Sequence, residues 1–339
     1  MASMRVLGVA LSCAVVVTAC SSGSKSTSST SPSSSGGSSS GGSSSGGASG
    51  KVTSIKVGTS PAVSNVPLYL AGSSGGAFSK HNLKFTPQVV TGGAVAIPLL
   101  LNGQLQFTAG DALGAMVAIS HKTPLVMVAV GNSAGSDAAH DNTGLVVKPN
   151  IASPADLSGK TIAVNALNGL AEITSKAAID ASGGDSKKVK FVETPIPQMA
   201  AAVKAGTVDG AVTTEPFLTA AKQQGLKDLL PIFSRSLPGV PQIAYITSKS
   251  YLASHPDVVK AFADSIKESN EEVTKDPSKI KTVALTSTKS TQAQLDATVL
   301  PVFTPATLQV DILNKLQTLA QKYGALQWTF DPTPYVYTG

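Results

Sequence analysis

Segments with strand-like sequence alternate with helix-like segments through residues 51–339, and this alternation limits the chain to few folds. Such an order is typical of a mainly parallel sheet that is covered by helices on both faces. We predict strands over residues 52–59, 83–90, 104–108, 124–130, 143–147, 161–165, 188–193, 208–213, 229–233 and 242–247. The sequence therefore predicts an α/β fold.

Helix start and stop signals occupy the stretches between these strands. We predict helices that begin near residues 65, 91, 110, 169, 198 and 215. Beyond residue 247, apolar residues recur at helical spacing in two stripes, which we interpret as helix faces packed on the core. The stripes are Val258, Val259, Phe262, Ile266 and Val273, and Leu308, Ile312, Leu313, Leu316, Leu319 and Tyr323.

Two parts of the chain resemble each other. Residues 92–111 and 198–216 both run helix, glycine stop, short strand and a turn into a second helix, and strand 54–59 resembles 160–165. The folded part of the chain is also long for a single compact core. We therefore predict two similar lobes joined by crossings near 141–145 and 240–246. Lobe 1 would comprise residues 51–143 and 245–339, and lobe 2 residues 144–244.

The first 50 residues read as targeting and tether segments rather than as part of the fold. Residues 1–20 have a positive start, a short apolar run and the lipobox-like string Val17-Thr18-Ala19-Cys20. We predict cleavage before Cys20 and attachment of a lipid to its thiol, which would anchor the protein on the extracytoplasmic face of the cell membrane. An ordinary signal peptide that happens to contain a cysteine is the alternative. Residues 21–50 are almost wholly Ser and Gly and predict a flexible tether.

Small polar residues and glycines follow the predicted strands of both lobes. Ligands of such sheets bind outside the carboxyl ends of the strands, where helices begin and free N–H groups attract anions. For each turn alone, a helix cap or a plain turn is the alternative. The predicted ligand-binding residues are Thr59, Ser60, Asn65, Thr91, Gly92, Gly93, Gly110, Asp111, Asn165, Asn168, Gly169 and Glu215. Tyr69, Phe217 and Tyr245 are candidates for stacking on a planar ligand, or else core residues.

Several function classes find little support in the sequence. The four histidines, His81, His121, His140 and His255, lie far apart and lack metal-ligand spacing, and Cys13 and Cys20 are the only cysteines. No nucleophile elbow, phosphate-binding loop or zinc-protease motif is present. The net charge of +6 comes from scattered lysines rather than from a basic stripe. We therefore expect a protein that is not an enzyme, holds no cofactor or metal and binds no nucleic acid.

Five runs in this order resemble the sulfonate-, nitrate- and thiamine-precursor-binding proteins of ABC importers. They are IKVG at 55–58, PLYLA at 67–71, GQLQFTAGD at 103–111, DLSGKTIAV at 156–164 and GTVDGAVTTEPF at 206–217. The resemblance implies a two-lobed periplasmic-binding-protein type II fold that closes on its ligand like a hinged trap. It departs from the family in the turn 60–67, which lacks a charged or aromatic residue that would contact a ligand.

The resemblance also implies a role in import. We expect a monomeric solute-binding lipoprotein that captures a small organic anion of the sulfonate or nitrate kind, or a pyrimidine-like solute. Its partners would be the ABC permease and ATPase subunits. Two alternatives stay open at this stage: a ligand-sensing lipoprotein that signals to a membrane kinase, and a secreted enzyme on the same fold.

Overall fold

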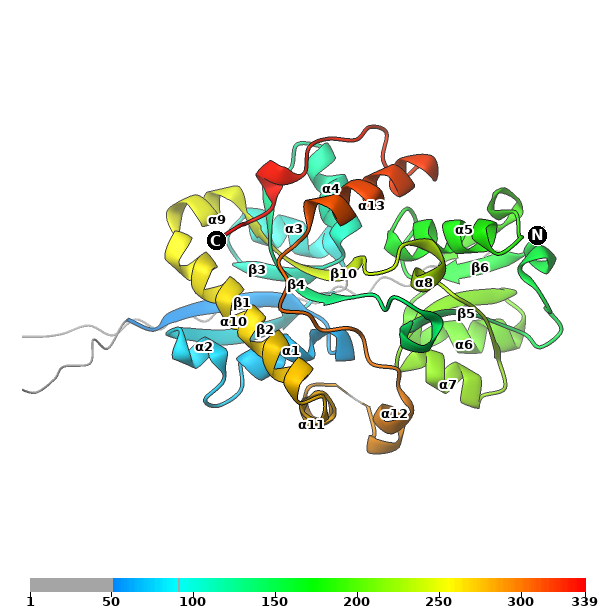
Figure 1. Cartoon of the computed structure of the whole chain (residues 1–339), viewed down its shortest axis with the longest axis horizontal. Helices are drawn as coiled ribbons and strands as arrows, with labels where there is room; N and C mark the ends of the chain where they lie inside the picture. Colours follow the sequence, from blue (N-terminus) through cyan, green and yellow to red (C-terminus); the bar gives the residue numbers. More distant parts are fainter. Residues whose placement is uncertain (1–50, 91, 289) are drawn as a thin grey trace, which may run out of the picture. The chain divides into compact units, whose positions relative to one another are not determined.

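The computed structural model describes residues 51–90, 92–288 and 290–339, which form two five-stranded sheets flanked by helices (Figure 1). The first sheet has the order β2-β1-β3-β10-β4. Its strands are β1 (Thr53–Thr59), β2 (Leu83–Val89), β3 (Phe107–Gly110), β4 (Leu125–Ser133) and β10 (Pro241–Ser248). β1, β2 and β3 are parallel, and β10 runs antiparallel between β3 and β4.

The second sheet has the order β7-β6-β8-β5-β9. Its strands are β5 (Thr143–Val147), β6 (Thr161–Val164), β7 (Lys190–Glu193), β8 (Gly210–Thr214) and β9 (Lys227–Pro231). β6 is parallel to β7 and β8, whereas β5 is antiparallel to β8 and β9. Each sheet thus contains one reversed strand, and that strand is the one the chain forms directly after leaving the other sheet.

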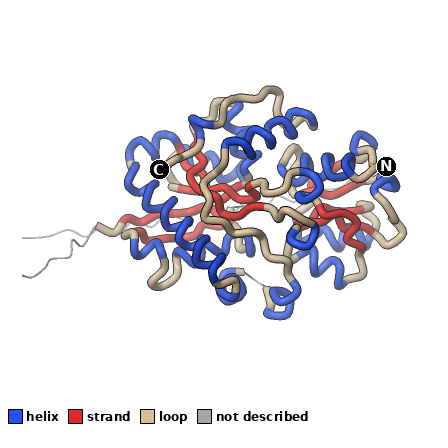
Figure 2. The backbone as a smooth tube through the Cα atoms, viewed as in Figure 1, coloured by secondary structure: helices blue, strands red, loops and turns tan. Residues whose placement is uncertain are grey.

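The two sheets and their helices define two lobes, called lobe 1 and lobe 2 below, and Figure 2 shows the strands of each lobe with helices outside them. The strand orders correspond, with β1, β2, β3, β10 and β4 matching β6, β7, β8, β5 and β9. The similarity between the two halves of the sequence therefore reflects one topology built twice. The predicted α/β class with two mainly parallel sheets is confirmed.

Helices cover both faces of the lobe 1 sheet. One face packs against α1 (Val66–Ala71), α2 (Ala77–Lys80), α9 (Lys249–Ser254) and α10 (Pro256–Lys275). The other face packs against α3 (Gly93–Leu101), α4 (Ala112–Ser120) and α13 (Val310–Lys322). The two apolar stripes predicted beyond residue 247 lie on α10 and α13, where Phe262 and Leu316 are fully buried.

The lobe 2 sheet is built in the same way. Alternate residues of β5 serve the two faces, because Leu145 and Val147 pack on the side of α5 (Leu170–Ala181). Val146 packs on the other side, against α6 (Ile196–Ala205) and α7 (Phe217–Gln223). This period of two is the pattern expected of a strand buried on both faces.

Three short helices belong to the connections. They are α8 (Phe233–Ser236), α11 (Ser278–Ser287) and α12 (Gln292–Ala297). Single 3-10 turns lie at Val63–Asn65, Ala138–His140, Pro154–Leu157, Ser186–Lys188 and Thr333–Tyr335. The sequence did not predict α2, α8, α9, α11 or α12. Four of these helices span only four to six residues, too few to show an apolar period, and the ten-residue α11 buries only Ile280 and Ala284.

The observed strand boundaries differ by a few residues from the predicted ones. β3 was predicted at 104–108 but spans Phe107–Gly110. Residue Gln106 instead holds the start of the pairing, since its side-chain Oε1 accepts from the Lys56 N–H at 2.8 Å. β8 was predicted at 208–213 and spans Gly210–Thr214. Residues at a strand start can be held by side-chain hydrogen bonds or by turns. The alternation of apolar residues does not reveal such contacts.

The two lobes share apolar packing. Leu170 and Ile173 of α5, together with Phe233 and Val240 of the second crossing, join the same buried cluster as α4 and α13 of lobe 1. Among the described residues, no helix has the length and apolar character needed to span a bilayer. The predicted signal segment, the tether and the lipidation site Cys20 lie outside the described residues.

Candidate functional site

Equivalent hydrogen bonds draw together the strand ends of each lobe. In lobe 1 the N–H of Val90, just after β2, donates to the Thr59 carbonyl at the end of β1 at 3.1 Å. In lobe 2 the N–H of Thr194, just after β7, donates to the Val164 carbonyl at the end of β6 at 2.9 Å. The predicted site residues that follow these strands therefore gather at the carboxyl edge of each sheet.

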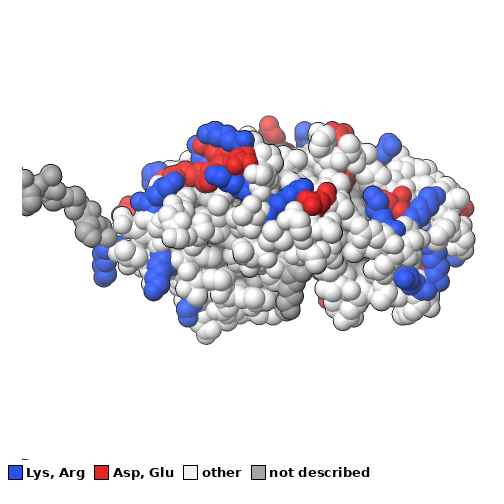
Figure 3. Space-filling view, turned by 90° about the horizontal axis from the view of Figure 1, so that it is seen from below, with Lys and Arg blue, Asp and Glu red and all other residues white. Residues whose placement is uncertain are grey.

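The two carboxyl edges face each other because of how the chain crosses between lobes. The crossings, residues 134–142 and 232–240, run from the ends of β4 and β9 to the starts of β5 and β10. β5 and β10 are antiparallel to their neighbours, so each starts at the edge where those neighbours end. Figure 3 shows the surface hollowed between the lobes, with most charged side chains of that view away from the hollow.

An amide pair joins the last residue of the first crossing to the start of β10. The Gln242 Nε2 donates to Asn142 Oδ1 at 2.7 Å, and the Asn142 Nδ2 donates to Gln242 Oε1 at 3.3 Å. The Asn142 carbonyl also accepts from the Glu215 N–H at 2.9 Å and from the Thr214 hydroxyl at 3.0 Å. Asn142 thus links the first crossing to the start of β10 and to the end of β8. The sequence did not predict this pair. The only local signal for Asn142 is that it is a polar residue directly before an apolar strand.

Asp141 holds the crossings together from a buried position. Its carboxylate accepts from the Ser234 N–H of the second crossing at 2.7 Å and from the Thr143 N–H at 3.2 Å. Burial raises the pKa of this carboxyl group, and the hydrogen bonds from Ser234 and Thr143 partly offset that rise. A side-chain hydrogen bond therefore ties the two crossings to each other.

The β1–α1 turn is held by two asparagines. Thr59 and Asn65 are buried and Ser60 is exposed. The Asn65 Nδ2 donates to the Ser60 carbonyl at 3.0 Å, and the Asn132 Nδ2 donates to the Ser64 carbonyl at 2.8 Å. Asn132, near the end of β4, was not among the predicted site residues, although an asparagine in a buried strand is unusual.

The other lobe 1 turns are built from glycines and one capping carboxylate. Gly92 is the N-cap of α3 with φ 156°, Gly93 is the first helical residue, and both are exposed. Asp111 is the N-cap of α4, where its Oδ1 accepts from the Gly114 N–H at 2.7 Å. Gly110 pairs with Ala244 of β10. The predicted residue Thr91 lies outside the described residues.

Burial raises the pKa of the Asp111 carboxyl group, and the N–H groups of the first turn of α4 work against that rise. The helix cap that the sequence offered as the alternative for this residue is thus present in the structure. A ligand contact by Asp111 stays a prediction.

In lobe 2 the β6–α5 turn leaves a helix start open. Asn165 and Asn168 are exposed, and Asn168 adopts a left-handed conformation with φ 56°. Its N–H donates to Glu172 Oε2 at 2.8 Å. Gly169 is the N-cap of α5 and no side chain caps that helix start. Backbone N–H groups at such a start attract anions and polar groups.

Glu215 combines a helix cap with a long-range link. The residue is buried, and its carboxylate accepts from the Thr219 N–H at 3.0 Å and the Thr219 hydroxyl at 2.8 Å. Its Oε1 also accepts from the Val299 N–H, in the segment after α12, at 3.3 Å. The carboxylate therefore ties the start of α7 to the C-terminal part of the chain, and its contact with a ligand stays a prediction.

The three aromatic candidates differ in environment. Tyr245 is fully buried and packs edge-on against Phe262 with 5.4 Å between ring centroids, so it is a core residue in this structure. Its hydroxyl has no hydrogen-bond partner among the described residues, and burial raises its pKa. Tyr69 is half-buried against Phe85. Phe217, at the start of α7, is 38% exposed and is the candidate with the most open ring of the three.

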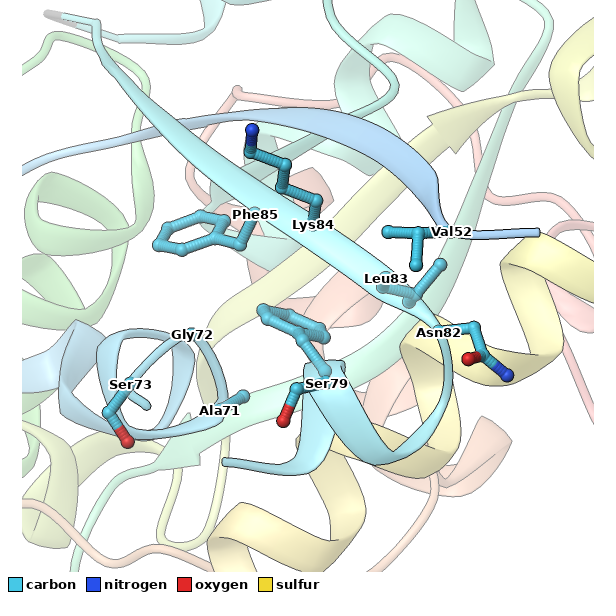
Figure 4. A pocket seen from close by; sticks show the side chains of 10 residues that line it. Val52, Ala71, Gly72, Ser73, Ser79, Asn82, Leu83, Lys84 and Phe85 are labelled. Atoms are coloured by element: carbon cyan, nitrogen blue, oxygen red, sulfur yellow. The ribbon is translucent and has the colours of Figure 1, made fainter. Parts of the chain in front are cut away.

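Two surface hollows lie away from these turns. One, of about 320 Å³, lies between β2 and the helices α1 and α2, where Phe85 and Leu83 lie above Ala71 and Ser79 (Figure 4). The other, of about 340 Å³, lies between α5, α8 and α13 and is lined by Asp180, Arg235 and Tyr323 among others. None of the predicted ligand-binding residues that the structure describes lines either hollow. Within the described part of the chain, no three His, Cys, Asp or Glu side chains gather as metal ligands.

Together the facing edges offer amides, hydroxyls and glycine backbone, which are hydrogen-bonding groups without fixed charge. The capping carboxylates Asp111 and Glu215 already accept from N–H groups of their own helices. This arrangement suits the binding of a small polar solute between the lobes.

Comparisons with known proteins agree with this architecture. A model of the family described as NMT1/THI5 like matches residues 63–280. The taurine-binding periplasmic protein of Escherichia coli (strain K12) is 30% identical over 174 residues, which are 51% of this chain and 52% of that protein. The match thus spans about half the length of this curated relative.

Solved structures show the same fold at low identity. The ligand-binding component of an ABC-type import system from Staphylococcus aureus, with zinc bound, has a TM-score of 0.73 at 15% identity, covering 84% of this chain and 96% of that one. The alkanesulfonate-binding protein SsuA from Xanthomonas axonopodis pv. citri, bound to MOPS, has a TM-score of 0.67 at 16% identity, covering 85% and 99%. The predicted two-lobed periplasmic-binding-protein fold is confirmed.

Proposed function

The chain belongs to the NMT1/THI5-like family, and on this premise we propose that it is the extracytoplasmic solute-binding protein of an ABC importer. The observation that carries the proposal is the pair of facing carboxyl edges, each lined by short polar or glycine turns at equivalent strand ends. In open α/β sheets, ligands bind at such edges. We propose lobe 1 as residues 51–143 and 245–339 and lobe 2 as residues 144–244, although the sheets assign Thr143 to lobe 2 and residues 241–244 to lobe 1.

Ligand capture would work by lobe closure. A ligand that contacts both edges binds the closed form more tightly than the open form, and this difference in affinity shifts the population toward closure. Bending would concentrate in the two crossings, which the hydrogen bond from the Ser234 N–H to the Asp141 carboxylate keeps side by side. The closed form would then be the shape that the permease and its ATPase recognise.

The ligand would be a small organic anion of the sulfonate or nitrate kind, or a pyrimidine-like solute. Among the described residues no side chain caps the starts of α3 and α5, at Gly92 and Gly169, so their N–H groups can donate to an anionic or carbonyl oxygen. The taurine-binding and alkanesulfonate-binding proteins among the similar sequences and structures support a sulfonate.

Anchoring completes the proposal. A lipid on Cys20 would hold the protein, as a monomer, on the outer face of the cell membrane, and residues 21–50 would let the folded part reach the permease. A tether of this length reaches roughly 30 Å on average. A Cys20→Ser variant tests this step: it should leave the membrane fraction while keeping its ligand affinity. Equal membrane retention of variant and wild type would refute the anchor alone.

The binding function is tested by thermal unfolding of the purified protein with sulfonates, nitrate and pyrimidines. At a ligand concentration one hundred times Kd, binding adds about 2.7 kcal/mol of stability, which raises Tm by several degrees. A Gly93→Ala variant tests the site, because among the described residues the added Cβ meets nothing closer than Ile97 at 3.8 Å. It should keep the ligand-free Tm and lose most of the ligand-induced shift. If no compound raises Tm, the binding proposal fails.

A further inference from the structure

Two buried asparagines at the lobe 1 edge have fixed orientations. The Asn65 and Asn132 side chains each place the Nδ2 against a main-chain carbonyl, of Ser60 at 3.0 Å and of Ser64 at 2.8 Å. A carbonyl oxygen only accepts hydrogen bonds, so the amide nitrogen and not the amide oxygen must face it. The usual ambiguity between the two ends of an asparagine side chain is therefore resolved at both positions by the carbonyl partner.

This orientation leaves two acceptors without partners. Asn65 is 1% exposed and Asn132 is 0% exposed. The Oδ1 atoms of both residues are buried and have no hydrogen-bond partner among the described residues. An unpaired buried acceptor is unfavourable, and buried polar groups in proteins are nearly always satisfied. An amide oxygen accepts hydrogen bonds and does not donate them, so only a group with N–H or O–H donors can form the missing hydrogen bond.

The two amides lie where the ligand is proposed to bind. Both hold the β1–α1 turn, which follows directly after the carboxyl end of β1. Asn132 is also paired in the sheet with Ile243 near the start of β10, at the same edge. Residues 59–66 and 130–133 contain no charged side chain. The region therefore offers hydrogen-bond acceptors with no charge of its own.

We propose that Asn65 and Asn132 determine ligand specificity by accepting hydrogen bonds from an N–H donor group of the solute, an amine or an amino-substituted ring. This inference rests on the proposed binding function and adds to it the chemistry of one end of the ligand. The uncapped helix starts at Gly92 and Gly169 would then receive an oxygen-rich end, so the preferred solute carries a donor group and an acceptor group at opposite ends.

Matched ligands test the donor requirement on the unmodified protein. Calorimetric titrations would compare 2-aminoethanesulfonate with its N,N,N-trimethyl derivative, which keeps the positive charge but has no N–H. A second pair is 4-aminopyrimidine and 4-(dimethylamino)pyrimidine. In at least one pair we expect the compound with N–H groups to bind at least about tenfold more tightly than its methylated partner. The methylated compound leaves the buried acceptors unpaired. Ethanesulfonate, which is smaller and has no N–H, should also bind weakly, and this excludes bulk as the cause.

Variants connect the preference to the two residues. Asn65→Leu and Asn132→Leu remove the acceptor at similar volume and should reduce the tenfold preference to about twofold or less. Asn314→Leu, on the exposed side of α13, makes the same exchange away from the edges and should keep the preference. If a variant does not fold, the ligand pairs on the wild-type protein still decide the question.

The outcomes separate this inference from the proposed function. Equal or tighter binding of the methylated compounds, or binding of nitrate and ethanesulfonate alone, overturns the donor preference and leaves the binding function intact. A preference for N–H ligands that survives both leucine variants overturns the assignment to Asn65 and Asn132. Failure of all these compounds to bind removes the proposed function and this inference with it.

Discussion

Asp111 and Glu215 occupy equivalent positions in the two lobes but form different hydrogen bonds. Each residue directly follows the third strand of its sheet, β3 or β8, and each accepts from an N–H of the helix that comes next. Asp111 has only that local role among the described residues. Glu215 is more deeply buried and also accepts from the Val299 N–H, 84 residues further along the chain. One topology, built twice, thus contains one local cap and one long-range link.

Through Glu215, lobe 2 is hydrogen-bonded to the C-terminal segment that follows α12. The hydroxyl of Thr219, which donates to Glu215, is also within 3.1 Å of the Ala297 carbonyl after α12. Leu295 of α12 belongs to the same buried apolar cluster as Val63 and Val66 of lobe 1. The Glu215 carboxylate therefore helps to tie lobe 2 to a segment that lobe 1 holds, which is a third connection besides the two crossings.

The largest expected effect comes from removing the long-range link. Glu215→Ala leaves the N–H groups of Thr219 and Val299 without their acceptor in a buried place, so we expect a loss of about 3 kcal/mol in the free energy of unfolding. Urea denaturation measures this loss. Glu215→Gln keeps one acceptor oxygen and should lose about half as much. A loss below that of Asp111→Ala would contradict the comparison.

The local cap should be worth less. Asp111→Ala removes the acceptor for the Gly114 N–H, and such N-cap losses cost about 1 kcal/mol. Asp111→Asn, which is an equally good cap, serves as the control in the same denaturation series. If the alanine variant lost as much stability as Glu215→Ala, Asp111 would have a tertiary role that this structure does not show.

A backbone change isolates the link from the cap at Glu215. Val299→Pro removes the N–H that donates to Glu215 but leaves both donors of Thr219 in place. The preceding residue, Thr298, has an extended conformation with ψ 132°, which a following proline accepts. We expect a loss of roughly 0.5–1 kcal/mol, since the bond is long at 3.3 Å. Val299→Ala keeps the N–H and should lose measurably less; equal losses would assign the effect to packing.

The smallest effect concerns pH. Burial raises the pKa of Asp111 in the folded protein, so the folded state binds a proton more readily than the unfolded chain. The stability associated with this group is fully present below the unfolded pKa and is lost as pH rises through the folded value. Asp111→Asn does not titrate, so its stability relative to wild type should rise between pH 3 and pH 7, by less than about 1 kcal/mol. A pH-independent difference in urea denaturation would contradict this.

Much of the fold could be predicted because it depends on local patterns. The strand β5 was predicted at 143–147 and is found there, since five consecutive apolar or small residues are bounded by polar ones. The stop at Gly206 has the left-handed conformation, φ 79°, that favours glycine at a helix end. The cap at Asp111 follows from a carboxylate placed directly before a helix.

The candidate site was less accessible to the sequence. Asn132, Asn142 and Gln242 were missed because their roles depend on partners far along the chain, such as Ser64 for Asn132 and Gln242 for Asn142. For Tyr245 the sequence left ligand stacking and a core position open, and the structure places it in the core, since only the fold decides that α10 covers its strand.

The sequence by itself determined the order of strands and helices, the repetition of that order and the helix caps, because each of these arises from residues within one or two turns of one another. The tertiary structure alone decided which strand of each sheet is reversed, how the two carboxyl edges meet and which buried amides remain unpaired. Those features depend on contacts between residues that are distant in the chain, and no local pattern encodes which of the possible partners a polar side chain will find.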